Sequence, residues 1–210
     1  MISNTTGTMS PLEADAALEL MNVSVGRACA SLSAMTGCTV NLSIPELAFN
    51  FFDTEYLTDL SVCSAVSQRF HGDMNGVTLL FFPGDMAESL VEGFIGAQLN
   101  VSDDIDREEL ELDALLEIGN IILNACIGSM VNQLDCNLIT EMPKYFKGDA
   151  KSLVTEAGLS GQYTMMLKTL IEIEDLNING YLTMVLDADS AEKFQQLIAA
   201  YLQVWIKHQH

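Results

Sequence analysis

Residues 113–120 read Asp-Ala-Leu-Leu-Glu-Ile-Gly-Asn, and residues 15–22 read Asp-Ala-Ala-Leu-Glu-Leu-Met-Asn. In both copies twenty-two residues separate the asparagine from a proline, which is Pro45 in the first copy and Pro143 in the second. The aspartate, glutamate, asparagine and proline are each displaced by 98 residues between the copies. A pattern of four positions that recurs in register indicates an internal duplication.

The motif residues of each copy share one face of a predicted helix. A helix advances about 100° per residue, so Asp113, Glu117 and Asn120 lie at roughly 0°, +40° and −20° around the axis. Asn124 returns to the same stripe, and the other residues between 112 and 124 are apolar or glycine. Asparagine is a poor helix former. The polar stripe therefore indicates a functional face, not ordinary solvation, and the first copy repeats it.

Apolar spacing and cap residues predict the order of the elements. We expect helices at about 11–36, 85–97, 105–134 and 189–206, strands at 38–45, 61–71, 76–82, 136–142, 163–174 and 180–186, and a loop at 144–162. Asn75-Gly76 and Asn179-Gly180 each separate two apolar runs, which predicts two hairpins, since asparagine and glycine both tolerate positive φ. Each repeat thus reads as a long helix, strands with a hairpin, and a shorter helix, over residues of about 10–98 and 104–208 in a single domain, 1–210.

Composition excludes several classes of function. The chain has 210 residues, 29 of them acidic against 9 basic, for a formal net charge of −20. Such a field repels phosphates, so we expect no nucleic-acid partner and no membrane surface. The first residues do not read as a signal peptide, and no apolar run is expected to approach the ~18 residues of a membrane span, which predicts a cytoplasmic protein.

The cysteines and histidines predict no metal centre. Five cysteines form no CxxC pair and read as reduced core thiols, and the three histidines fit no zinc spacing. His208 and His210 lie at the end of the chain, where a fixed coordination geometry is not expected. We expect no cofactor of the chain's own.

A carboxylate beside a carboxamide has a limited chemistry. The carboxylate pairs with a cation, and the carboxamide donates and accepts hydrogen bonds but does not take a proton near neutral pH. Such a pair suits the orientation of a water molecule, as in phosphoryl transfer, where positioning supplies much of the acceleration. The chain has no GxxxxGK loop. A phosphoryl group and Mg²⁺ would therefore come from a partner.

The doubled D-x3-E-x2-N-x22-P pattern resembles the signature of the CheC, CheX and FliY chemotaxis phosphatases, and the two-site layout is most similar to the CheC-like form. The resemblance implies a pseudo-twofold α/β (α+β) fold, in which an antiparallel sheet packs with helices. It also implies hydrolysis of the aspartyl phosphate on a CheY-type response regulator that carries Mg²⁺, with a CheD-type deamidase as a second partner. In that family the glutamates pair with a lysine of the regulator and the asparagines align the water. The implied catalytic residues are Glu19, Asn22, Glu117 and Asn120, with Asp15, Asp113, Pro45 and Pro143 in supporting positions.

Two departures from the family pattern concern the first copy. Met21 stands where the second copy has Gly119, and Arg27 brings a cation near the motif. Both predict a weaker first site. Two other functions fit the same residues: a non-catalytic adaptor that binds a phosphorylated regulator or a CheD-type deamidase, and a structural component of a flagellar switch.

Overall fold

The computed structural model describes residues 9–51, 62–96, 107–158 and 163–207. Its helices are α1 (Pro11–Thr36), α2 (Met86–Gly96), α3 (Arg107–Leu134), α4 (Ala150–Glu156) and α5 (Ala188–Lys207), with a short 3-10 helix η2 (Glu174–Leu176). Its strands are β1 (Val40–Leu42), β2 (Glu46–Phe51), β3 (Cys63–Gly72), β4 (Gly76–Pro83), β5 (Leu138–Thr140), β6 (Lys144–Gly148), β7 (Tyr163–Ile173) and β8 (Ile178–Asp187).

The strands form one antiparallel sheet in the order β1-β7-β8-β4-β3-β5, with β2 also paired to β7 and β6 also paired to β3. The two hairpins meet at the centre, where β4 pairs with β8. The short strands of each predicted repeat pair with the hairpin of the other, β1 with β7 and β5 with β3. The predicted α+β fold with an antiparallel sheet is confirmed.

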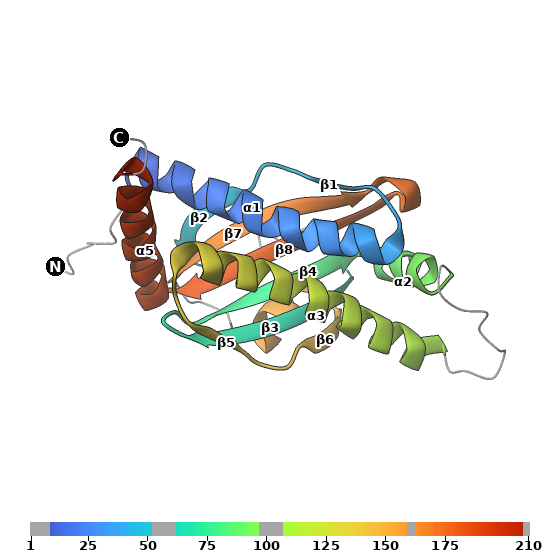
Figure 1. Ribbon diagram of the computed structural model, residues 1–210. Helices are drawn as coiled ribbons and strands as arrows, with labels where there is room; N and C mark the ends of the chain where they lie inside the picture. Colours follow the sequence, from blue (N-terminus) through green and yellow to red (C-terminus); the bar gives the residue numbers. More distant parts are fainter. Residues whose placement is uncertain (1–8, 52–61, 97–106, 159–162, 208–210) are drawn as a thin grey trace.

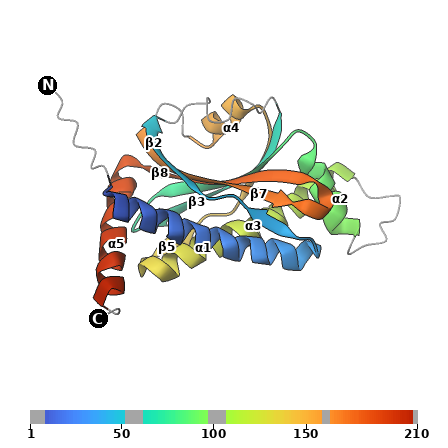
Figure 2. The ribbon, with the colours of Figure 1, turned by 90° about the horizontal axis from the view of Figure 1, so that it is seen from above.

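The long helices α1 and α3 lie side by side and antiparallel on one face of this sheet (Figure 1). Helix α4 lies on the opposite face, and α5 and α2 stand at the two ends (Figure 2). The main apolar core fills the space between the sheet and the helix pair. Polar side chains also join the pair, since Gln133 Nε2 on α3 donates to the buried Ser24 Oγ on α1 over 3.2 Å.

The ends of α1 are fixed by local hydrogen bonds. Ser10 Oγ accepts from the Glu13 backbone N over 3.3 Å, and the Ser10 backbone N donates to Glu13 Oε2 over 2.8 Å, a capping box. These bonds lower the pKa of the Glu13 carboxyl. At the other end Gly37 takes φ 72° and its N–H donates to Ser33 O, which satisfies a terminal carbonyl.

Helix α3 approaches the sheet closely because it has a glycine at the contact. A Cβ added to Gly119 would lie 2.5 Å from Val66 Cγ1 and 2.6 Å from Val66 Cβ on β3. The equivalent residue of α1 is a methionine, whose side chain is buried. The two long helices therefore pack differently on the sheet although their motifs match.

The predicted loop at 144–162 is wrong. Lys144–Gly148 is strand β6, paired with β3, and Ala150–Glu156 is helix α4, capped by Asp149, whose side chain accepts from the Ser152 backbone N over 2.9 Å. Strand β2 was not predicted either. The strand expected at 38–45 ends at Leu42. Residues 43–45 leave the ladder pairing with β7, and the pairing resumes with β2 from Glu46.

Both predicted hairpins are present, and the positive φ angles fall a few residues before the Asn-Gly pairs. Neither Gly76 nor Gly180 has positive φ; Gly72 (φ 137°) and Asn177 (φ 51°) do. The glycines are required by close contacts, because a Cβ on Gly76 would lie 2.5 Å from the backbone O of Val185. A Cβ on Gly180 would likewise meet the Phe82 ring.

The expectation that no apolar run reaches membrane-spanning length is also wrong. Leu112–Leu134, in α3, is long and apolar enough to cross a bilayer. In the structure more than half of its most apolar window is buried. Core helices of soluble proteins meet the same criterion, so the stretch alone does not indicate a membrane span. The predicted boundary between repeats, at 98–104, and the histidines at 208 and 210 lie outside the described residues.

Candidate functional site

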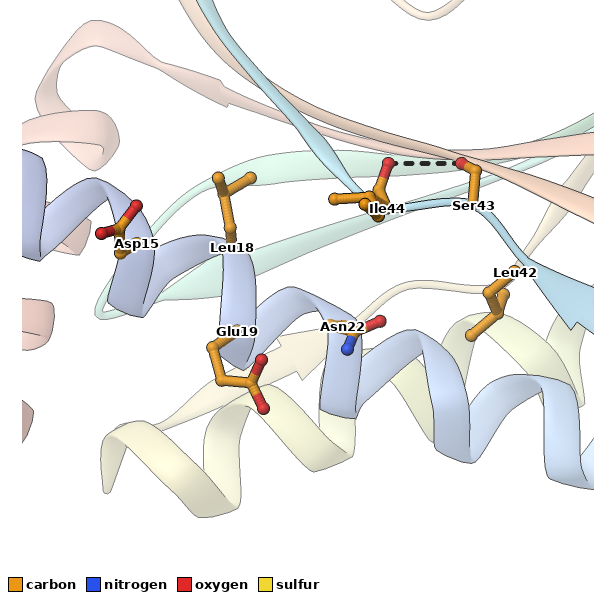
Figure 3. Close-up of a pocket in the computed structure, with 7 residues that line it drawn as sticks. All are labelled: Asp15, Leu18, Glu19, Asn22, Leu42, Ser43 and Ile44. Atoms are coloured by element: carbon orange, nitrogen blue, oxygen red, sulfur yellow. Dashed lines mark hydrogen bonds between the residues drawn. The ribbon is translucent and has the colours of Figure 1, made fainter.

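The first copy of the motif forms an exposed face of α1. Asp15, Glu19 and Asn22 project from successive turns of this helix, and all three are exposed (Figure 3). A shallow hollow of about 220 Å³ lies between this face and the segment that follows β1. The hollow is lined by Asp15, Leu18, Glu19, Asn22, Leu42, Ser43 and Ile44.

The second copy occupies the corresponding face of α3. Asp113 and Glu117 are exposed, and Asn120 is half-buried. The structure thus brings the acid and the amide of each copy to the surface of one helix. It does not bring the two copies into a common pocket, because each lies on its own helix of the pair.

The asparagine of the second copy is held by a neighbour. Asn124, one turn further along α3, donates from Nδ2 to Asn120 Oδ1 and to the Asn120 backbone O, both over 2.8 Å. Among the described residues, Asn22 in the first copy has no side-chain hydrogen-bond partner. The sequence placed Asn124 on the polar stripe but gave no sign of this bond.

The two prolines of the motif interrupt the edge strands. Pro45 is buried between β1 and β2, and Pro143 is half-buried between β5 and β6. A proline cannot donate to a strand ladder, and the residue before it favours an extended conformation. The two breaks therefore lie at equivalent places in the two copies.

Each break exposes one large apolar side chain. The residues before the prolines are Ile44 and Met142, which are 84% and 83% exposed. Ile44 lines the hollow beside Glu19 and Asn22. Sequence reasoning missed both residues, although the 98-residue offset between them was available as a signal.

The prediction that Met21 crowds the first site is wrong. Its side chain is only 1% exposed and belongs to the core under α1, away from the helix face that carries Asn22. Arg27 is exposed, and a Cβ added at Gly26 would have no heavy atom within 4 Å. The space around the first motif is therefore open.

The buried thiols of Cys29, Cys63 and Cys126 are chemically quiet. The described cysteines are all free, and burial raises the pKa of Cys29 and Cys126 to about 12 and that of Cys63 to about 11. Such thiols carry little thiolate, the reactive form. Within the described ranges no three His, Cys, Asp or Glu side chains converge as a metal-binding group. The motif faces offer a carboxylate, which accepts hydrogen bonds and pairs with cations, and an amide, which donates and accepts hydrogen bonds.

Comparison with known proteins places these features in a family context. No family model matches the chain. The CheY-P phosphatase CheC of Bacillus subtilis (strain 168) is 20% identical over 194 residues, which cover 88% of this chain and 92% of that protein. The structure of FliY from Thermotoga maritima superposes with a TM-score of 0.70 at 17% identity, covering 92% of this chain and 99% of that chain. A chain of the CheX–CheY–BeF3–Mg²⁺ complex from Borrelia burgdorferi has a TM-score of 0.54 at 14% identity, with coverage of 79% and 97%.

The fold and these matches define the class that the chain resembles: it has the fold of the CheX and FliY structures and is similar in sequence to CheC, all of the CheC, CheX and FliY superfamily. This superfamily includes CheY-P phosphatases. The present chain is similar to CheC at a low level of sequence identity.

Proposed function

We propose that this protein hydrolyses the aspartyl phosphate of a CheY-type response regulator. The observation that carries the proposal is the Glu and Asn of both copies at the same spacing on the outer face of the helix pair, with both glutamates and Asn22 exposed and Asn120 half-buried. The face of a helix is convex, so its side chains can enter a cleft on another protein. The acid and amide would therefore act inside the partner's phosphorylation site.

The carboxylates supply binding. Glu19 and Glu117 form no ion pair with any described residue, so each is available to a cation from outside. A lysine beside the regulator's phosphoryl group is the cation that the family resemblance implies. The net charge of −20 adds long-range attraction for a basic surface.

The amides supply positioning. Asn22 and Asn120 would each hold a water molecule in line with the phosphorus–oxygen bond of the acyl phosphate. The water oxygen forms a bond to phosphorus, the bond to the aspartate oxygen breaks, and the carboxylate leaves as an anion. Inorganic phosphate is the product, and the proton of the water passes to it or to solvent. Orientation of this kind is a large part of catalysis when the transition state is loose.

The regulator would bring the remaining groups. The family resemblance implies that the Mg²⁺ belongs to the regulator, next to the phosphorylated aspartate, so we propose that this chain needs no cofactor of its own. Regulators of this type act in the cytoplasm, which is where we propose that the protein works. Asp15, Asp113 and the two prolines would support the sites without contacting the phosphate.

The test is phosphate release from a phosphorylated CheY-type protein with the wild type, Asn22→Ala, Asn120→Ala and the double variant. Loss of both amides is expected to lower the rate by about 10²-fold, the size typical for removal of one positioning or polarising group. Asn132→Ala is a matched control, because Asn132 is an exposed asparagine of α3 outside the motif face. It is expected to behave as the wild type.

The same assay distinguishes hydrolysis from binding alone. If the regulator loses phosphate at its own rate with every variant, while the wild type still binds it, the protein is an adaptor and the proposed activity is wrong. Binding is measured separately by titration of the regulator with BeF3 and Mg²⁺. If CheD-type deamidase binds instead and the phosphorylated regulator does not, both the enzymatic and the regulator-binding proposals fail.

A further inference from the structure

A chain of hydrogen bonds runs from the sheet to the asparagine of the second copy. Asn124 Nδ2 donates to Asn120 Oδ1 over 2.8 Å. Asn124 Oδ1 in turn accepts from Gln68 Nε2 on β3 over 3.4 Å and from Thr140 Oγ1 on β5 over 3.3 Å. Both ends of the Asn124 amide are therefore engaged, which fixes which end faces Asn120.

Gln68 is the buried residue at the sheet end of this series of hydrogen bonds. Its side chain is 2% exposed, and Nε2 also donates to the Glu141 backbone O over 3.1 Å. Its Oε1 is buried with no partner among the described residues. Turning the amide round would place Oε1 against two acceptor oxygens, so the observed orientation is the better of the two. A buried carbonyl without a partner is destabilising, and an apolar side chain would fit the core at lower cost.

The first copy of the motif lacks this series of hydrogen bonds. The counterparts of Asn124, Thr140 and Glu141, 98 residues earlier, are Gly26, Leu42 and Ser43. The strand pairing makes Thr169 the counterpart of Gln68, and Thr169 Oγ1 donates to the Ser43 backbone O over 3.0 Å, as Gln68 does to that of Glu141. From there the polar contacts stop, because glycine and leucine have no side-chain donor or acceptor to pass them on to α1.

We propose that Asn124 is a positioning residue that holds the Asn120 carboxamide for catalysis, so that the second site is preorganised and the first is not. The inference rests on the proposed function and adds to it which site is dominant and why. With Oδ1 of Asn120 bound to Asn124, rotation of the amide is restricted before any partner arrives. The Asn22 amide stays free to rotate until the regulator binds. The cost of ordering its side chain at that moment lowers the activity of the first site.

The difference between the two sites predicts a difference in their kcat values. Asn22→Ala leaves only the second site and Asn120→Ala only the first. The second site alone is expected to have a kcat roughly 10-fold above that of the first, since small errors of placement at a reacting group have effects of this order. KM is expected to stay within about twofold, because the acids that bind the regulator are the same in both copies.

The positioning role is tested by Asn124→Ala in the Asn22→Ala background. The expected result is a kcat lowered by roughly 10-fold with KM unchanged. Alanine is the best helix former, and Gln68 keeps its bond to the sheet, so the helix is expected to stay folded. Thr140→Val keeps the shape of a β-branched residue, removes one donor to Asn124, and is expected to give a smaller loss of roughly threefold.

A second measurement needs no regulator. In ¹⁵N-labelled protein the side-chain amide protons of Asn124 are expected to exchange with solvent more slowly than those of the exposed Asn132. Substitution of Asn120 by Ala is expected to remove part of that protection. Equal exchange at the two asparagines would overturn the proposed bond.

The outcomes separate the two proposals. If the wild type accelerates dephosphorylation but Asn124→Ala has no effect on kcat, the positioning role is refuted and the proposed function stands. If Asn124→Ala raises KM alone, the residue contributes to binding and the inference is also wrong. If the wild type gives no acceleration, the proposed function itself fails and the inference falls with it.

Discussion

Replacement of Gly119 by alanine tests how closely α3 packs on the sheet. The added Cβ would lie 2.5 Å from Val66 Cγ1, 2.6 Å from Val66 Cβ and 2.8 Å from Val66 Cγ2. Atoms of this kind do not approach closer than about 3.4 Å without repulsion. Val66 is β-branched and buried in β3, so it cannot swing away by a change of rotamer. Helix α3 must move outward or the strand must shift.

The net effect follows from two opposing terms. Overpacking of a core typically destabilises by about 1–3 kcal/mol. Alanine in place of glycine favours the helix by about 1 kcal/mol. We therefore expect the free energy of unfolding to fall by up to about 2 kcal/mol, or Tm to fall by up to about 8 °C for a chain of this length.

A glycine at the other helix provides a control with the opposite sign. A Cβ at Gly26 has no heavy atom within 4 Å, so Gly26→Ala gains the helix preference without a clash. It is expected to raise stability by about 1 kcal/mol. Thermal and urea unfolding of the two variants are compared with the wild type. If Gly119→Ala is as stabilising as Gly26→Ala, the close contact between α3 and β3 does not exist.

Further outcomes follow from the exposed apolar residues and from the thiols. Ile44→Asp is expected to raise KM for the phosphorylated regulator roughly 10-fold at the first site, because a nearly fully exposed apolar side chain that lines the hollow beside Glu19 and Asn22 would be covered by the partner. Met142→Asp, at the equivalent position of the second copy, is expected to act likewise at the second site; unchanged KM in both would exclude that contact. In native protein at pH 8, iodoacetamide is expected to label Cys38 and to spare Cys29 and Cys126, because burial raises the pKa of both buried thiols to about 12 and leaves about one in ten thousand ionised. The folded protein favours the neutral form of these two thiols, so the free energy of unfolding is expected to fall as pH rises from about 9 towards 12. Labelling of Cys29 and Cys126 at pH 8 in folded protein would show that both thiols are accessible.

The elements with strong periodicity were predictable from the sequence. The expected helix at 105–134 is observed as Arg107–Leu134, and the one at 11–36 as Pro11–Thr36. Both have long apolar faces, and Pro11–Thr36 begins at a capping box that is visible in the sequence. Strand β6 was missed because Lys144–Gly148 has two lysines and a glycine in five residues. It is a strand because it lies along the free edge of β3.

The candidate site was predictable only in part. Helical spacing was sufficient to expect the acid and amide of each copy on one exposed face, and the structure has them there. The contacts of Asn124 with Gln68 and Thr140 depend on strands 56 and 16 residues away in the chain, which a single sequence does not bring together. The error over Met21 has a similar cause: its neighbour in the sequence is Asn22, but its neighbours in space are core residues.

The exchange of short strands between the two halves also affects how the polypeptide is made. The Thr39 backbone N donates to Asp175 Oδ2 over 2.7 Å, a bond between residues 136 positions apart. Strand β1 has no ladder partner until β7 has been synthesised. Closing such distant contacts is slow. The amino-terminal half therefore emerges from the ribosome with an open sheet edge, and reaches its final pairing only after most of the chain has been translated.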